Sequence, residues 1–282
     1  MTNHKFLPLE QDTFEGTRDA LHAYSRVLGS WAKTCRDRRK HWWHASLRPG
    51  LTGFTTGVVY GDVPFEINLD LRESALTVRT ALGEQMWEEL RGQPALEVAA
   101  RVRRFLEPLG AANLLPDMPA GDDSFTRSFD GYSTEEAHKL GRIMSAVSAT
   151  FEKFRAGIRE ETSPIQLWPH HFDLAMLWLP GDKIAGQDPN DEEYADKQMN
   201  FGFTLGDDGI PEPYFYITAY PLPDGFPAHE LPAGTEWHTQ GFTGAVLRYR
   251  RLCRETDPGA YLQQLWNGLL ADGKQHLATQ SS

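Results

Sequence analysis

Residues 65–71 read FEINLDL, and the spacing of apolar and polar side chains here decides the fold class. The apolar residues stand at every second position, which is the period of a β-strand with one buried face. Apolar residues at the same spacing in 76–82 predict a second strand after a turn at 72–74. The Thr- and Gly-rich stretch 51–59 predicts another. Residues 41–90 are therefore expected to form an antiparallel meander of four or five strands.

Helices are predicted on both sides of this meander. From Asp12 to Arg38 the apolar side chains recur at steps of three and four residues, which is typical of an amphipathic helix. Asp12 with Glu15 fits an N-terminal capping pair. A shorter helix is expected to open at Pro94 and to close near Gly110.

The same order of elements is predicted again further along the chain. Ser133 and Glu136 form a capping box before a second long apolar stripe. Pro258 begins a last helix, and the polar tail after Ala271 is expected to fray. Strands are expected between these helices, at 166–179, 199–205, 214–220 and 244–249.

This repetition predicts an α+β fold made of two similar helix–antiparallel meander–helix halves. The first half is expected at 1–113 and the second at 132–282. The Pro-, Gly- and Asp-rich stretch 114–131 is the expected linker. We expect one compact unit in which the halves pack about a pseudo-twofold axis.

Charge and cysteine content exclude several classes of function. The chain has 28 Lys and Arg against 39 Asp and Glu, a net charge of −11, which opposes binding to nucleic acid or to an anionic membrane. The basic run at 36–40 is interpreted as a solvated helix end in preference to an anion site. Cys35 and Cys253 are too far apart in the sequence for a zinc ribbon or a CxxC motif. No secretory signal or membrane-spanning run is visible, so the cytoplasm is the expected compartment.

Two segments are dense in histidine and tryptophan, HWWHASL at 41–47 and WPHHFDLA at 168–175. If both were regular strands, successive side chains would point to opposite faces. The first segment, extended to residue 48, would then place Trp42, His44, Ser46 and Arg48 on one face. The second would place His171 and Asp173 on one face. Glu66 and Asn68 are expected nearby if the two halves pair as equivalents.

Three chemistries are compatible with these residues. His44, His171 and Asp173 could form a metal triad with open positions. Alternatively, Asp173 could orient His171 as a general base, with Ser46 as a nucleophile. The third interpretation is a pocket whose rings stack on a ligand while His and Asp bind its polar groups. The chain has no HExxH, GxSxG or glycine-rich phosphate motif.

Several of these motifs resemble an uncharacterised bacterial family known only as a domain of unknown function. They are HWWH at 41–44, FEIN at 65–68, Ser-Pro at 163–164 and FDLA at 172–175. The resemblance extends over nearly the whole chain and implies one conserved fold without implying an activity. Residues 168–171 depart from the Trp-Gly pattern of other members, so the resemblance supports His44 and Asp173 more than His171.

The combined prediction is a protein that binds a small molecule in an aromatic, His-lined pocket between the halves. The expected lining is Trp42, Trp43, His44, Ser46, Glu66, His171 and Asp173. The first alternative is an enzyme with a His/Asp site, which works either with a divalent metal ion or by acid–base chemistry alone. The second is a structural or interaction protein. No cofactor is predicted beyond that divalent metal, and neither nucleic acid nor membrane is an expected partner.

Overall fold

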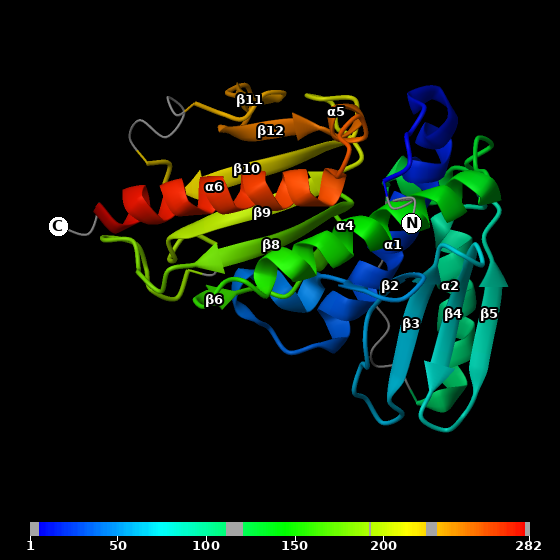
Figure 1. Cartoon of the computed structure of the whole chain (residues 1–282). Helices are drawn as coiled ribbons and strands as arrows, with labels where there is room; N and C mark the ends of the chain where they lie inside the picture. Colours follow the sequence, from blue (N-terminus) through cyan, green and yellow to red (C-terminus); the bar gives the residue numbers. More distant parts are fainter. Residues whose placement is uncertain (1–5, 111–120, 192, 224–229, 280–282) are drawn as a thin grey trace. The chain divides into compact units, whose positions relative to one another are not determined.

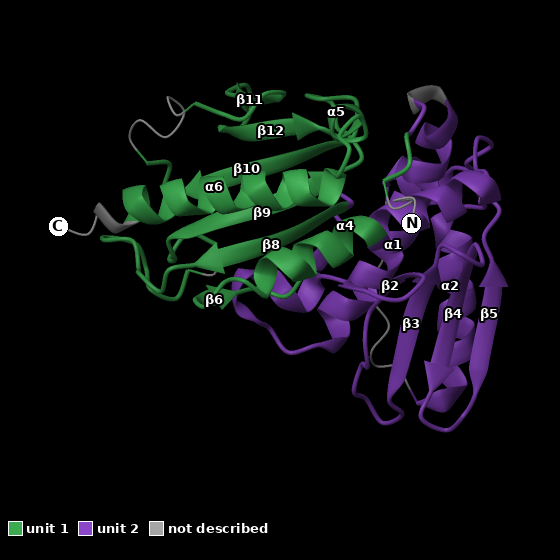
Figure 2. Ribbon diagram, viewed as in Figure 1, with its two compact units in different colours: residues 1–8, 146–165, 173–282 green, residues 9–145, 166–172 purple. Residues whose placement is uncertain are grey.

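The computed structural model describes residues 6–110, 121–191, 193–223 and 230–279 (Figure 1). Helices and antiparallel sheets alternate along the chain, which confirms the α+β prediction. The chain forms two compact units, shown in Figure 2. Unit 1 is Met1–Pro8, Ala146–Ile165 and Asp173–Ser282, and unit 2 is Leu9–Ser145 and Gln166–Phe172.

The sheet of unit 2 is the meander predicted from FEINLDL. Five antiparallel strands follow one another in chain order. Along the strand Phe65–Asp70 buried and half-buried residues alternate, as the period of two requires. The strands are β1 (Arg48–Pro49), β2 (Gly53–Thr55), β3 (Phe65–Asp70), β4 (Ala75–Thr80) and β5 (Gln85–Glu89).

Helix α1 (Gln11–Cys35) supplies the other side of the core of unit 2. Its apolar stripe is buried, and the ring of Trp31 meets that of Phe65 edge-on at 6.0 Å between centroids. The predicted capping pair is wrong, because the helix begins one residue earlier, with Glu10 at the N-cap. The other elements of the unit are η1 (Lys40–Ala45), α2 (Ala95–Leu106), η2 (Glu107–Leu109), α3 (Asp123–Thr126) and β7 (Gln166–Trp168).

Unit 1 is built on a second antiparallel sheet, with strand order β11-β12-β10-β9-β8-β6. In Figure 1, α6 lies across β9 and β10 on one face of this sheet. The unit boundary falls inside α4, at residue 146. The strands are β6 (Glu161–Thr162), β8 (Asp173–Leu179), β9 (Gln198–Thr204), β10 (Tyr214–Tyr220), β11 (Thr235–His238) and β12 (Gly244–Arg248), and the helices are α4 (Thr134–Arg155), α5 (Tyr249–Leu252) and α6 (Pro258–Thr279).

The duplication into two similar halves is not confirmed. In unit 1, β12 lies between β10 and β11, so its sheet is not a simple meander like that of unit 2. Strand β11 was not predicted at all. The half boundaries at 113 and 132 and the pseudo-twofold axis stay predictions. Residues 114–120 of the expected linker lie outside the described residues, and its described part contains α3.

Two predicted elements are wrong in detail. The single strand expected at 166–179 is two strands, β7 and β8, separated by a turn at 169–172. The tail after Ala271 does not fray within its described part, because α6 continues to Thr279, and residues 280–282 lie outside the described residues. Leu277 in this last part is buried, and Lys197 Nζ donates a hydrogen bond to its carbonyl oxygen at 2.8 Å.

Candidate functional site

The HWWH segment of unit 2 is a tight 3-10 turn, and the strand considered for 41–48 is wrong. Within η1, His41 has φ 53° and ψ 28°, and Trp42 has φ 57° and ψ 22°. Both therefore lie in the left-handed region, where a side chain crowds the backbone. Only Arg48, just beyond the segment, belongs to a strand, so the shared strand face expected for Trp42, His44 and Ser46 does not exist.

Trp42 is in contact with two cations and an imidazole. Its ring is 37% exposed and stacks on the ring of His44, with centroids 5.7 Å apart and an interplanar angle of 27°. Arg38 Cζ lies 4.9 Å from the centroid of the Trp42 ring, and Lys33 Nζ lies 5.7 Å from it. Lys40 Nζ lies 5.5 Å from the Trp43 ring. Each contact of this kind contributes roughly 0.5–1 kcal/mol at an exposed site.

His44 is buried and its ring orientation is fixed by the backbone. The N–H of Arg39 donates to His44 Nδ1 at 3.2 Å. An imidazole that accepts at Nδ1 and is neutral carries its proton on Nε2. In this tautomer Nε2 carries a hydrogen and is not a metal ligand, which argues against a role for His44 in metal coordination.

Ser46 holds the segment in place. It is fully buried, its Oγ donates to the carbonyl oxygen of Trp43 at 2.8 Å, and it accepts from Gln166 Nε2 at 2.6 Å. Beside it, Leu47 and Leu167 exchange two backbone hydrogen bonds of 2.9 and 3.0 Å. These contacts fix the register between the HWWH segment and β7, and they assign Ser46 a positioning role.

Glu66 lies on β3, where its described contact belongs to the sheet. Thr55 Oγ1 on the neighbouring strand donates to Glu66 Oε1 at 2.6 Å. The same Thr55 oxygen accepts from the backbone N–H of Gly57 at 2.8 Å. A role for Glu66 in ligand binding stays a prediction.

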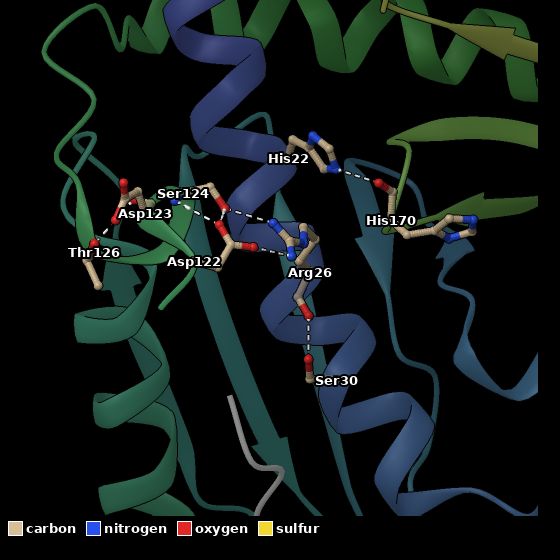
Figure 3. Close-up of polar contacts among 8 residues, drawn as sticks. All are labelled: His22, Arg26, Ser30, Asp122, Asp123, Ser124, Thr126 and His170. Carbon is tan, nitrogen blue, oxygen red and sulfur yellow. Dashed lines mark hydrogen bonds and ion pairs between the residues drawn. The ribbon is translucent and has the colours of Figure 1, made fainter. Parts of the chain in front are cut away.

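His170 and His171 stand in the turn between β7 and β8. Phe172 closes this turn in the left-handed region, with φ 57°. The face that His171 was expected to share with Asp173 therefore does not exist. His22 Nε2 lies 3.2 Å from the carbonyl oxygen of His170 (Figure 3), and the rings of His170 and His171 lie 4.3 Å apart.

Acid is expected to weaken unit 2 through His170. Desolvation of the ring, followed by the charges of His171 and His22, lowers the pKa of His170 from 6.5 to about 4. Between these two values the folded chain binds fewer protons than the unfolded chain, so stability falls as the pH falls from about 6.5 to about 4. His170→Gln should flatten this part of the curve of unfolding free energy against pH, measured by denaturant titration.

The matched control for this prediction is His138→Gln, at an exposed histidine of α4. It should leave the slope unchanged. Part of the slope persists in both variants, because burial also lowers the pKa of His22. Identical slopes in His170→Gln and the unchanged protein would contradict the prediction.

A polar cluster beside His22, drawn in Figure 3, joins α1 to α3 and was not predicted. Arg26 donates to Asp122 Oδ2 at 2.6 Å and to Ser124 Oγ at 2.7 Å. Asp122 caps α3 by accepting from the backbone N–H of Ser124. The hydrogen bonds from Ser124 and then Arg26 lower the pKa of Asp122 to about 2. Because these charges pair with each other, we assign the cluster a structural role.

Asp173 begins β8 in unit 1 and is buried. The hydroxyl of Tyr216 on β10 donates a hydrogen bond to Asp173 Oδ2. Burial, followed by the charge of Asp173, raises the pKa of Tyr216 well above 10, and Asn200 also bonds to this hydroxyl. Tyr216 was missed because its contact with Asp173 spans 43 residues, and the only sequence signal was that both stand on predicted strands.

The predicted site residues thus divide between the two units. The structure brings Trp42, Trp43, His44 and Ser46 together in one turn of unit 2, whereas Asp173 belongs to unit 1. Among the described residues, no group of three or more His, Cys, Asp or Glu side chains could hold a metal ion. A triad of His44, His171 and Asp173 would draw on both units, and it stays a prediction.

No described helix has the length and apolar character that crossing a membrane requires.

Comparison with known proteins identifies the family. No match is found among curated proteins or among solved structures. One family model, described as a family of unknown function (DUF5996), matches residues 6–272. The match spans nearly the whole chain, as the resemblance carried by HWWH and FDLA implied. The chain therefore belongs to this family of unknown function (DUF5996).

Proposed function

We propose that the protein binds a small organic molecule at the HWWH turn of unit 2. In this proposal the molecule stacks on Trp42, Trp43 forms the adjoining wall, and His44 supplies polar recognition. The observation that carries the proposal is the conformation of the turn. Two consecutive residues with side chains, His41 and Trp42, are held in the left-handed region, and this places the indole ring of Trp42 partly in solvent.

The cost of this conformation supports a functional role. A residue other than glycine in the left-handed region costs about 1–3 kcal/mol, and such residues cluster at ligand-binding and catalytic sites. Neither His41 nor Trp42 is the Gly or Asn that usually relieves this crowding. The turn is nevertheless fixed from its C-terminal side by the buried hydrogen bond between Gln166 and Ser46. A preorganised aromatic surface of this kind binds a ligand with little loss of conformational entropy.

The alternative of a His/Asp enzyme has less support from the described contacts. Ser46 Oγ donates to a backbone carbonyl and accepts from an amide, so its hydrogen bonds are those of a structural serine. The ring of His44 accepts at Nδ1 from the backbone, whereas a catalytic histidine usually donates from Nδ1 to a carboxylate. These contacts favour binding over nucleophilic catalysis at the HWWH turn.

Trp42→Leu tests the proposal against a matched control. A library of small aromatic molecules would be screened by thermal shift, and affinities for the hits would be measured by calorimetric titration. We expect Trp42→Leu to weaken binding by roughly tenfold, because aromatic stacking contributes about 0.5–1.5 kcal/mol. Trp87→Leu should bind normally, since Trp87 is a 58% exposed tryptophan on β5 of the same unit. A screen without hits, or equal affinities in Trp42→Leu and the unchanged protein, would contradict the proposal.

A further inference from the structure

Arg36 and Arg48 are half-buried arginines beside the HWWH turn. Arg36 is the C-cap residue of α1, and its Nη1 donates to the carbonyl oxygens of His44 and Ser46 at 3.3 and 3.1 Å. Arg48 lies on β1, directly after the turn. Its Nη1 is buried and has no hydrogen-bond partner among the described residues.

No carboxylate in the described part of the chain pairs with either guanidinium. Other half-buried arginines in this structure do have acidic partners. Arg26 pairs with Asp122, and Arg248 pairs with both Glu212 and Glu236, all with N–O distances between 2.6 and 3.0 Å. Burying part of a charged group without a counter-charge is costly, so two half-buried guanidinium groups without a carboxylate need an explanation.

The charge of Arg48 also acts on Arg36. Burial lowers the pKa of Arg36, and the charge of Arg48 is the next largest cause. Burial alone lowers the pKa of Arg48. Residues 33–48 hold six Lys and Arg and one Asp, a local charge of 6 − 1 = +5 in a chain whose net charge is −11. The interpretation of residues 36–40 as a solvated helix end does not account for Arg36, which donates to two backbone carbonyls. Arg48 lies outside that run.

We propose that Arg36 and Arg48 bind an oxyanion, namely the phosphate or carboxylate group of the small molecule whose ring stacks on Trp42. The planar guanidinium fork of arginine matches both groups, and an anion between the two cations would cancel their repulsion. His44 links the two parts of the site, because its carbonyl accepts from Arg36 and its ring stacks on Trp42. This inference rests on the proposed function and adds the chemical class of the ligand.

A small anion fits these observations better than a polyanion. Residues 33–48 carry a local net charge of +5, while the chain as a whole carries an excess of 11 acidic groups. A nucleic acid needs a basic surface that follows many phosphates. The single buried nitrogen without a partner, Arg48 Nη1, can donate to one anionic group of a ligand.

The test uses three ring probes of similar size, phenyl phosphate, benzoate and the neutral benzyl alcohol, together with inorganic phosphate. Binding to the whole protein would be measured by calorimetric titration at constant ionic strength. We expect phenyl phosphate or benzoate to bind roughly tenfold or more tightly than benzyl alcohol, since charge-assisted hydrogen bonds supply the difference. The stronger of the two anions identifies the group that the site prefers.

Arg48→Met should bind the anions and benzyl alcohol with about equal affinity. Arg48→Lys should retain only part of the preference for the anions, because lysine keeps the charge without the planar fork. The matched control is Arg104→Met, at an exposed arginine of α2 in the same unit, and it should bind like the unchanged protein. Without any anion, Arg48→Met should melt at the same temperature as the unchanged protein or higher, because a half-buried charge whose buried Nη1 has no hydrogen-bond partner is removed. The melting temperature therefore tests the role of Arg48 even if the variant binds none of the probes.

The outcomes separate this inference from the proposed function. Equal binding of the anions and benzyl alcohol, with no effect of Arg48→Met, would overturn the oxyanion site while leaving ring binding at Trp42 intact. Binding of inorganic phosphate that depends on Arg48, with ring probes unaffected by Trp42→Leu, would support the oxyanion site and overturn the stacking proposal. Failure of all four probes to bind would overturn the inference.

Discussion

Trp266→Ala is expected to lower the free energy of unfolding of unit 1 by about 3–5 kcal/mol, the usual cost of truncating a large buried ring. Trp266 is fully buried on α6. Its ring stacks on Phe151 of α4 at 4.5 Å between centroids, and it also meets Phe154 at 5.3 Å and Phe215 of β10 at 6.0 Å. The substitution therefore removes ring contacts that α6 makes with α4 and with the sheet.

Denaturant unfolding followed by circular dichroism measures this loss. Hydrogen exchange of amides in β9 and β10 would show that the loss belongs to unit 1, because these strands lie under α6. The matched control is Trp87→Ala at an exposed site on β5, which should change stability by less than about 0.5 kcal/mol. A loss below about 1 kcal/mol for Trp266→Ala would mean that α6 is held mainly by other contacts.

Local periodicity was sufficient to predict most regular elements. The alternation in FEINLDL gave β3 with the correct buried face, and the predicted strand at 214–220 matches β10. The apolar stripe from Asp12 to Arg38 gave α1 within a few residues of its ends. These predictions succeed because side-chain burial repeats with the geometry of the element itself, so neighbouring positions carry the signal.

The candidate site was located by composition, but its geometry could not be predicted. Nothing in HWWH marks a left-handed turn, because the usual signals, Gly and Asn, are absent. The break between β7 and β8 did have a signal, since Pro169 cannot donate to a sheet and favours a turn. Periodicity does not encode contacts between residues distant in the sequence. It therefore could not predict that Arg48 Nη1 lacks a partner, or that Tyr216 bonds to Asp173.

Gly202→Ala is expected to destabilise unit 1 by roughly 3 kcal/mol through the Tyr216–Asp173 pair. Gly202 on β9 lies directly opposite Tyr216 on β10, and the tyrosine ring crosses the space where a side chain would stand. A Cβ atom at position 202 would lie 2.0 Å from Tyr216 Cζ and 2.3 Å from its hydroxyl oxygen. The ring must therefore move, and Asp173 would lose a charge-assisted hydrogen bond worth about 1.5–3 kcal/mol, in addition to the strain.

A double-mutant cycle separates this cause from a general weakening of β9. In a Tyr216→Val background the ring is gone, so adding the methyl group at Gly202 should cost less than about 1 kcal/mol. Tyr216→Phe removes the hydroxyl and keeps the ring, and it should cost about 1–3 kcal/mol because Asp173 loses its partner. If Gly202→Ala cost the same in the Tyr216→Val background as in the unchanged protein, the glycine would be required by the strand itself. Coupling between the two sites would instead show that Gly202 is needed so that Tyr216 can reach across the sheet to a buried carboxylate.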